Sequence, residues 1–107
     1  MSRGDYPAHM GSRSQSYAVY ILTNKHHTVL YTGITNNLQR RLLEHRGGSG
    51  PAFTYHYQAH KLVYYELFGG ARLAIAREKQ IKAGPRSRKV ALIESVNPGW
   101  RDLSEDW

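Results

Sequence analysis

Residues 17–34 read YAVYILTNKHHTVLYTGI, and this stretch decides the fold. Two runs of β-branched and aromatic residues flank a polar segment, which is a pattern typical of a β-hairpin. With the turn centred between Lys25 and His26, Tyr20 is expected directly across from Tyr31. Both phenol rings would then lie on one face of the sheet, because directly opposed residues share a face.

The residues after the hairpin predict one further strand and three helices. Segment 35–37 (Thr-Asn-Asn) offers an N-cap for a helix that begins at Leu38 and ends at the two glycines 47–48. Segment 49–60 has no clear period and is expected to be an irregular loop or partial turn. Beyond it, the sequence predicts a strand over 61–68 and helices over 71–83 and 86–96. The expected element order is β-β-α-β-α-α.

The helix predicted over 71–83 carries an acid on its apolar side. The apolar arc is expected to consist of Ala71, Ala74, Ile75 and Ile81. Glu78 falls in the middle of this arc, where a carboxylate is costly unless it is paired, protonated or bound to a cation. Glu78 therefore needs a partner. Other inward-facing residues are expected to be Val90, Ile93 and Val96 of the last helix, and Trp100 and Leu103 of the tail.

Composition limits the class of protein. The chain has 107 residues, no cysteine and a formal net charge of +7. Without cysteine, a disulfide scaffold, a thiolate metal cluster and a cysteine nucleophile are excluded. The positive charge favours nucleic acid as the partner. A membrane is not expected, because no apolar run approaches the ~20 residues of a spanning helix.

The chain divides into two parts. Residues 1–16 lack hydrophobic periodicity and are expected to be a disordered leader that resembles a tag-derived segment. Residues 17–107 are expected to form one domain. Because no targeting signal is visible, a cytoplasmic location is the default expectation.

Together, five residues could hydrolyse a phosphodiester bond: Tyr20, Tyr31, Arg41, His45 and Glu78. This reaction needs an activated nucleophile, positive charge on the phosphate and usually a hard divalent cation. Arg41 can clamp a phosphate with two parallel hydrogen bonds, and Glu78 can offer oxygen to one Mg²⁺ or Mn²⁺ ion. His45, one helical turn after Arg41, can assist proton transfer or bind phosphate. A tyrosine would need the cation and Arg41 beside it to act as a base.

These residues stand in segments that resemble the GIY-YIG endonuclease domain. The segments are Ala18-Val19-Tyr20, Tyr31-Thr32-Gly33, 37–41 (NLQRR), His45 and 76–82 (AREKQIK). The resemblance extends over about 17–107 and is greatest to the short standalone bacterial members. Ala18 stands where the name-giving glycine would be, and Thr32 where isoleucine or valine is usual.

The resemblance implies a fold and a set of roles. The fold would be α/β (α+β), a three-stranded antiparallel sheet flanked by helices. One catalytic metal ion would lie on Glu78, and Arg41 would bind phosphate. Either Tyr20 or Tyr31 would be the general base or would position water, and His45 matches a histidine found in several family nucleases.

The main hypothesis is a metal-dependent endonuclease acting on DNA in preference to RNA, with little sequence specificity and with a structure-directed or repair-related role. The residues expected to contact the phosphate backbone are Lys82, Arg86, Arg88 and Lys89. Two alternatives stay open. One is a nucleic-acid-binding module without catalysis, and the other is a recruitment subunit of a larger repair complex. For Glu78 itself, an internal ion pair with Arg41 or Lys82 is the alternative to a metal ion. The sequence leaves a protein partner and the oligomeric state open.

Overall fold

The computed structural model describes residues 16–107, so the prediction of a disordered leader over 1–16 concerns, apart from Ser16, residues outside the described range. In this range a three-stranded antiparallel sheet with the order β2-β1-β3 is combined with four helices. The strands are β1 (Tyr17–Thr23), β2 (Leu30–Thr35) and β3 (Lys61–Phe68). The helices are α2 (Leu38–Gly47), α3 (Ala52–His56), α4 (Ala71–Ala83) and α5 (Arg86–Val96). The predicted α+β class with its three-stranded sheet is confirmed.

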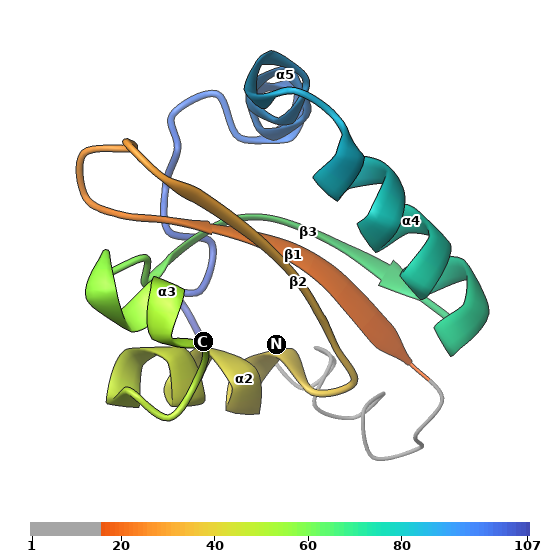
Figure 1. The fold of residues 1–107 in the computed structure, drawn as a ribbon, viewed down its shortest axis with the longest axis horizontal. Helices are drawn as coiled ribbons and strands as arrows, with labels where there is room; N and C mark the ends of the chain where they lie inside the picture. The colour runs from red at the N-terminus through yellow and green to blue at the C-terminus, as the bar shows by residue number, and fades with distance from the viewer. Residues whose placement is uncertain (1–15) are drawn as a thin grey trace.

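The sheet separates two helical layers, with α2 and α3 on one face and α4 and α5 on the other (Figure 1). Because successive strand residues point to opposite faces, the central strand β1 supplies both cores. The core under α4 and α5 contains Val19, Ile21, Val63, Ala74, Ile81, Ile93 and Trp100. The core over α2 contains Ala18, Tyr20, Leu22, Leu38, Leu42 and Leu62. None of the helices in residues 16–107 is long and apolar enough to cross a membrane.

The register of the hairpin differs from the prediction. Tyr20 pairs with Gly33 rather than with Tyr31, which pairs with Leu22. The prediction of direct opposition is therefore wrong by two residues. Since the shift is even, both tyrosines still lie on the face that α2 covers.

The turn explains this shift, because it is centred between His26 and His27. The N–H of His27 donates to the carbonyl of Asn24 at 3.1 Å. The Asn24 side chain accepts from the N–H of Thr28 at 2.8 Å, and His27 adopts a left-handed φ of 59°. A side-chain cap and one left-handed residue thus move the turn by one residue from the predicted position, between Lys25 and His26.

The segment predicted as an irregular loop or partial turn, 49–60, contains a five-residue helix, α3, that the sequence did not predict. Two backbone N–H groups, of Thr54 and Tyr55, donate to the carbonyl of Pro51 at 3.1 and 3.4 Å. The hydroxyl of Thr54 donates to the same carbonyl at 2.9 Å, and Gln58 ends the segment with a left-handed φ of 55°. The element order is therefore β-β-α-α-β-α-α.

Two residues expected in the core are exposed. Ile75 is 44% exposed, because α4 buries a stripe centred on Ala74 and Ile81, and Ile75 is turned from Ala74 by about 100°. Val96, at the last position of α5, is 65% exposed. The tail packs as predicted, because Trp100 is buried and the chain beside it pairs with β3.

Candidate active site

A buried chain of hydrogen bonds joins β1, α2 and α3. The hydroxyl of Tyr20 lies 2.9 Å from Nε2 of His45, and Nδ1 of His45 lies 2.8 Å from Oγ1 of Thr54. Thr54 donates its single hydroxyl proton to the carbonyl of Pro51. Nδ1 of His45 must therefore carry the proton of the His45–Thr54 bond, which leaves Nε2 to accept the proton of Tyr20. Thr54 thus sets the tautomer of His45.

Burial keeps both members of the Tyr20–His45 pair neutral. Burial, followed by the charge of Arg41, lowers the pKa of His45 to about 4. Burial also raises the pKa of Tyr20 to about 12, although a hydrogen bond with Arg41 acts in the opposite direction. At neutral pH the pair is therefore a phenol that donates to an imidazole.

Arg41 of α2 lies beside this chain and reaches the surface. One guanidinium nitrogen lies 2.7 Å from Oε1 of Glu44, and the nearby Tyr20 is a further cause of the raised pKa of Arg41. Arg41 is thus held by Glu44, while its side chain stays 34% exposed. Its remaining N–H groups can bind an anion from solvent.

Gly33 makes room for Tyr20. A Cβ atom at position 33 would lie 2.5 Å from Cζ of Tyr20 and 3.0 Å from Cε2 of Tyr31. The Tyr20 ring therefore lies across the backbone of its cross-strand partner, which only glycine permits. This contact is the physical reason for glycine in the Tyr31-Thr32-Gly33 motif.

Tyr31 lies between this buried chain and the surface. Its ring centroid is 5.4 Å from that of His45 and 6.3 Å from that of Tyr20. On its other side the ring stacks on Phe53 at 6.1 Å. Tyr31 is half-buried, and it is the smallest of the causes that raise the pKa of Lys82 on α4. Its ring thus contacts the buried chain on one side and Phe53 on the other.

Glu78 belongs to the α4 side. Its carboxylate lies 2.7 Å from Nζ of Lys82, and its side chain is 13% exposed while that of Lys82 is 54% exposed. This is the Lys82 partner that the sequence left open, whereas no hydrogen bond or ion pair joins Glu78 to Arg41 within residues 16–107. The structure thus brings four predicted residues together, Tyr20, Tyr31, Arg41 and His45, whereas the ion-pair partner of Glu78 is Lys82 of its own helix.

The donor set near Glu78 fits a shared metal ion. Among residues 16–107, no three His, Asp or Glu side chains gather in a group that could hold a metal. A cage made of protein ligands is therefore not formed in this part of the chain. Mg²⁺ commonly binds through one or two carboxylates, with waters and a substrate phosphate as its other ligands. Glu78 provides one such carboxylate.

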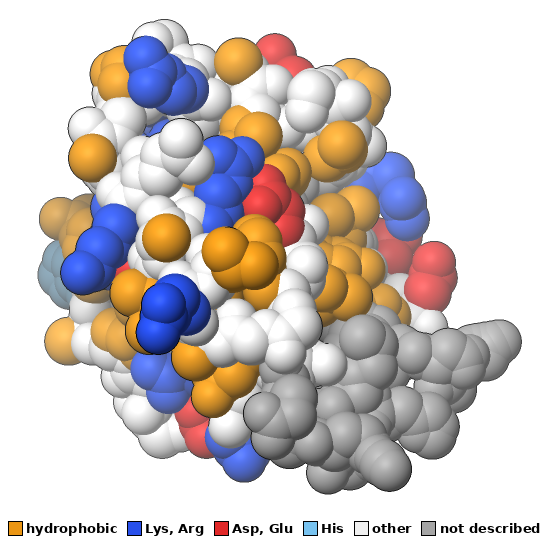
Figure 2. All heavy atoms as spheres, turned by 90° about the vertical axis from the view of Figure 1, so that its right-hand side faces the viewer, with side chains coloured by type: hydrophobic (Ala, Val, Ile, Leu, Met, Phe, Trp, Pro, Cys, Tyr) orange, Lys and Arg blue, Asp and Glu red, His pale blue; other side chains and the backbone are white. Residues whose placement is uncertain are grey.

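The four predicted phosphate-contacting residues differ in how the protein itself engages them. They are Lys82, Arg86, Arg88 and Lys89, at the junction of α4 and α5. Arg86 donates to the carbonyl of His27 at 2.7 Å, and Lys89 donates to that of Gly84 at 2.6 Å. Exposed Arg88 makes no hydrogen bond or ion pair with any described residue. On the side of the molecule that carries α4, basic side chains are spread among hydrophobic ones (Figure 2).

Sequence reasoning missed three residues of the site. Glu44 could have been found, because it stands three residues after Arg41 on one helix and four after Arg40. Thr54 and Phe53 gave no signal, because both belong to the unexpected helix α3. Their roles depend on contacts with α2 and β2 that no local pattern shows.

Comparisons with known proteins agree with this arrangement. The profile of the family described as GIY-YIG catalytic domain matches residues 16–90. A UPF0213 protein of Clostridium perfringens is 46% identical over 77 residues, which is 72% of this chain and 82% of that protein. A UPF0213 protein of Natronomonas pharaonis is 39% identical over 75 residues, 70% of this chain and 87% of that protein.

A solved structure has the same fold. It is the solution NMR structure of a UPF0213 protein from Bacillus halodurans, with a TM-score of 0.54 and 27% sequence identity. The superposition covers 84% of this chain and 95% of the other. The family profile spans the elements that carry Tyr20, Arg41 and Glu78.

Proposed function

Since this chain belongs to the GIY-YIG family of nuclease catalytic domains, we propose that it is an endonuclease that hydrolyses phosphodiester bonds in DNA. The observation that carries the proposal is the directed hydrogen-bond chain from Tyr20 through His45 to Thr54, beside which Glu44 holds Arg41. Every donor in this chain points inward, and the remaining N–H groups of the part-exposed Arg41 are left for an anion. Such an arrangement suits a phosphate that must be bound in one orientation.

We assign different roles to the two tyrosines. Tyr20 is almost fully buried and already donates to His45, so it acts as a positioning residue for Arg41. Tyr31 is half-buried, and its ring lies beside those of Tyr20 and His45. Tyr31 is therefore the phenol that faces the attacking water, as its general base or as the group that orients it.

Glu78 would hold one Mg²⁺ or Mn²⁺ ion. When bound, this ion supplies positive charge to the phosphate oxygens. Lys82 now occupies the carboxylate, and its exposed side chain can leave at little cost because exposed ion pairs contribute weakly. Arg41 would bind a non-bridging oxygen from the opposite side, and Glu44 would keep its guanidinium in plane.

Substrate preference follows from charge and size. The net charge of +7 favours a polyanion, with exposed cations such as Arg88 on the phosphate backbone. Within residues 16–107 one sheet and its helices carry the site, and no separate module there reads bases. We therefore propose action on DNA rather than RNA, with little sequence specificity and with selection of unpaired, branched or damaged structures, as in repair.

The test is cleavage of supercoiled plasmid and of a labelled single-stranded oligonucleotide with Mg²⁺, Mn²⁺ or EDTA. E78Q and R41A should each lower cleavage by about 10² to 10³ while DNA binding persists, because each removes charge stabilisation of the transition state. The matched controls are E105Q, from an exposed pair of the same spacing, and R40A, which shares Glu44. Equal cleavage by E78Q and E105Q would overturn the metal site. Salt-sensitive binding without cleavage of any substrate would favour the binding-module alternative.

A further inference from the structure

We propose that the cavity beside α3 is a second phosphate-binding site, which holds a nucleotide adjacent to the cleaved bond and stacks its base on Tyr57. The proposal rests on the proposed function for the identity of the strand. It assigns a site that the five predicted catalytic residues do not include. The cavity measures about 750 Å³, which is ample for one nucleotide.

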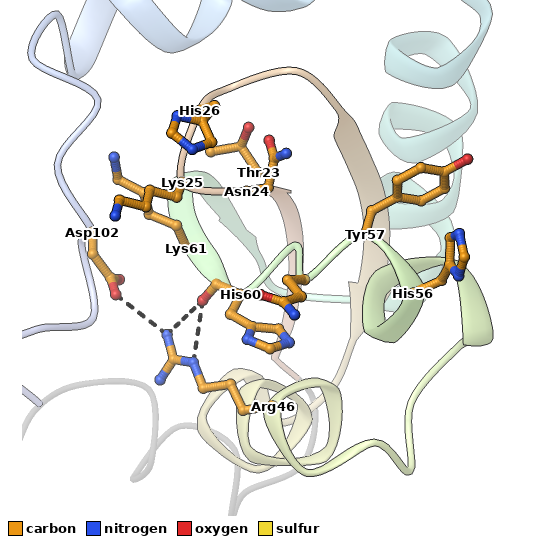
Figure 3. Close-up of a pocket in the computed structure, with 11 residues that line it drawn as sticks. Thr23, Asn24, Lys25, His26, Arg46, His56, Tyr57, His60, Lys61 and Asp102 are labelled. Carbon is orange, nitrogen blue, oxygen red and sulfur yellow. Dashed lines mark hydrogen bonds and ion pairs between the residues drawn. The ribbon is translucent and has the colours of Figure 1, made fainter.

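The walls of the cavity come from five separate segments. They are the β1–β2 turn, the end of α2, the end of α3, the start of β3 and the tail, and Lys25 and Lys61 lie across the cavity from His56 and Tyr57 (Figure 3). Among the lining residues, Asp102 alone is acidic, and it pairs with Arg46 at 3.4 Å. The cavity therefore keeps an excess of positive charge, which suits a phosphate.

Lys25 and Lys61 both have N–H groups that can donate to a ligand. Nζ of Lys61 lies 2.9 Å from Nε2 of His27. Burial, followed by the charge of Lys61, lowers the pKa of His27, so this histidine is neutral and accepts the bond. Lys61 retains two further N–H donors. Lys25 is exposed and makes no hydrogen bond or ion pair with any described residue.

A row of aromatic rings leads from the candidate active site to this cavity. Tyr31 contacts Phe53 at 6.1 Å between ring centroids, and Phe53 contacts Tyr57 at 4.8 Å. Phe53 is 42% exposed and Tyr57 is 45% exposed. Exposed aromatic rings that follow a basic groove are the usual platform for unpaired bases. A strand that leaves Tyr31 would therefore cross Phe53 and reach Tyr57 at the rim of the cavity.

The cavity also adjoins the buried chain of the active site. Arg46 and His60 line it, and the charges of both act on the pKa of His45. Nε2 of His60 is buried and has no hydrogen-bond partner among residues 16–107. The carbonyl of His60 accepts from Arg46 at 2.9 and 3.1 Å, so this wall of the cavity is tied to the helix that carries His45.

The test measures binding in EDTA, where metal-dependent cleavage cannot interfere, by fluorescence anisotropy of a labelled single-stranded oligonucleotide. Y57A should weaken binding at least about tenfold, because the base can no longer stack on a ring, while Y57F should bind like the wild-type protein. The matched control is Y55A, on an exposed tyrosine of α3 two residues before Tyr57 that lies outside the aromatic row. The K25A/K61A double variant should lower the salt dependence of binding by about 0.7 for each phosphate that it no longer neutralises. K79A, on an exposed lysine of α4, is its control.

Two further results decide the proposal. On an oligonucleotide of abasic residues, Y57A and Y55A should bind equally, because no base remains to stack. The proposal is overturned if Y57A and Y55A bind the ordinary strand equally and the double variant keeps the wild-type salt dependence. These outcomes are independent of cleavage: weakened binding in Y57A together with normal cleavage by E78Q would sustain this site and refute the proposed metal-dependent function.

Discussion

The two sides of the candidate site are built differently. On the α2 side, Tyr20 and His45 are buried and every polar atom of the chain to Thr54 has a partner. On the α4 side, Glu78 has one ion pair, with Lys82, whose side chain is 54% exposed while that of Glu78 is 13% exposed. On the α2 side the protein itself satisfies every hydrogen bond. On the α4 side the ion pair can be replaced, by a cation on Glu78 or by a phosphate on Lys82.

This difference separates stability from ligand binding. Buried hydrogen bonds are expensive to break because a desolvated group is left unpaired. An exposed ion pair of one helical turn contributes about 0.3–0.5 kcal/mol. Substitutions on the α2 side should therefore lower both the free energy of unfolding and the activity. Substitutions on the α4 side should change ligand binding alone.

The largest effect on stability is expected from acid. The folded pKa of His45 is about 4, below its ordinary value of 6.5, so the unfolded chain takes up a proton first as pH falls. Stability should be complete above pH 6.5 and fall by up to about 3 kcal/mol between pH 6.5 and 4. Urea unfolding over this range should show a flatter profile for H45Q than for the wild-type protein. The control is H56Q, on an exposed histidine of α3. Parallel profiles for wild type and H45Q would contradict the buried neutral imidazole.

Two buried threonines offer the next comparison. T54V removes the acceptor of the His45 Nδ1–H group and should cost about 1–3 kcal/mol. T32V replaces a buried hydroxyl that has no partner among the described residues, and should be neutral or stabilising. Cleavage should also fall in T54V, because the His45 tautomer is released. Equal melting temperatures for the two variants would show that Thr54 does not fix His45.

The sequence predicts those parts of the fold that depend on local patterns. The runs at 17–23 and 61–68 form strands because they are rich in β-branched and aromatic residues, and Asn37 caps α2 because its side chain accepts from the N–H of Arg40. The hairpin register escaped prediction because it depends on the side chain of Asn24 and the left-handed His27. Such effects of single residues do not show in the hydrophobic periodicity of a sequence.

The sequence predicts which residues belong to the site, but it does not predict how they are arranged. The resemblance selected Tyr20, Tyr31, Arg41 and His45, which the structure brings together. The partner that orients His45 lies in α3, a helix of five residues without periodicity. The basic cavity was invisible because its cations come from segments that are distant in sequence.

The smallest effect on stability is expected at Lys82. K82M breaks the pair with Glu78 and should change the free energy of unfolding by no more than about 0.5 kcal/mol, because the lysine is more than half exposed. R101M, which breaks the exposed pair with Glu105, is the control of equal spacing. The function of the α4 side should nevertheless respond, since the hydrogen bond that raises the pKa of Lys82 holds an ammonium on the carboxylate. A magnesium titration of cleavage should reach half-maximal rate at a lower concentration in K82M than in R101M. A large loss of stability, or an unchanged titration, would mean that Glu78 and Lys82 form a structural pair and that the two sides of the site are built alike.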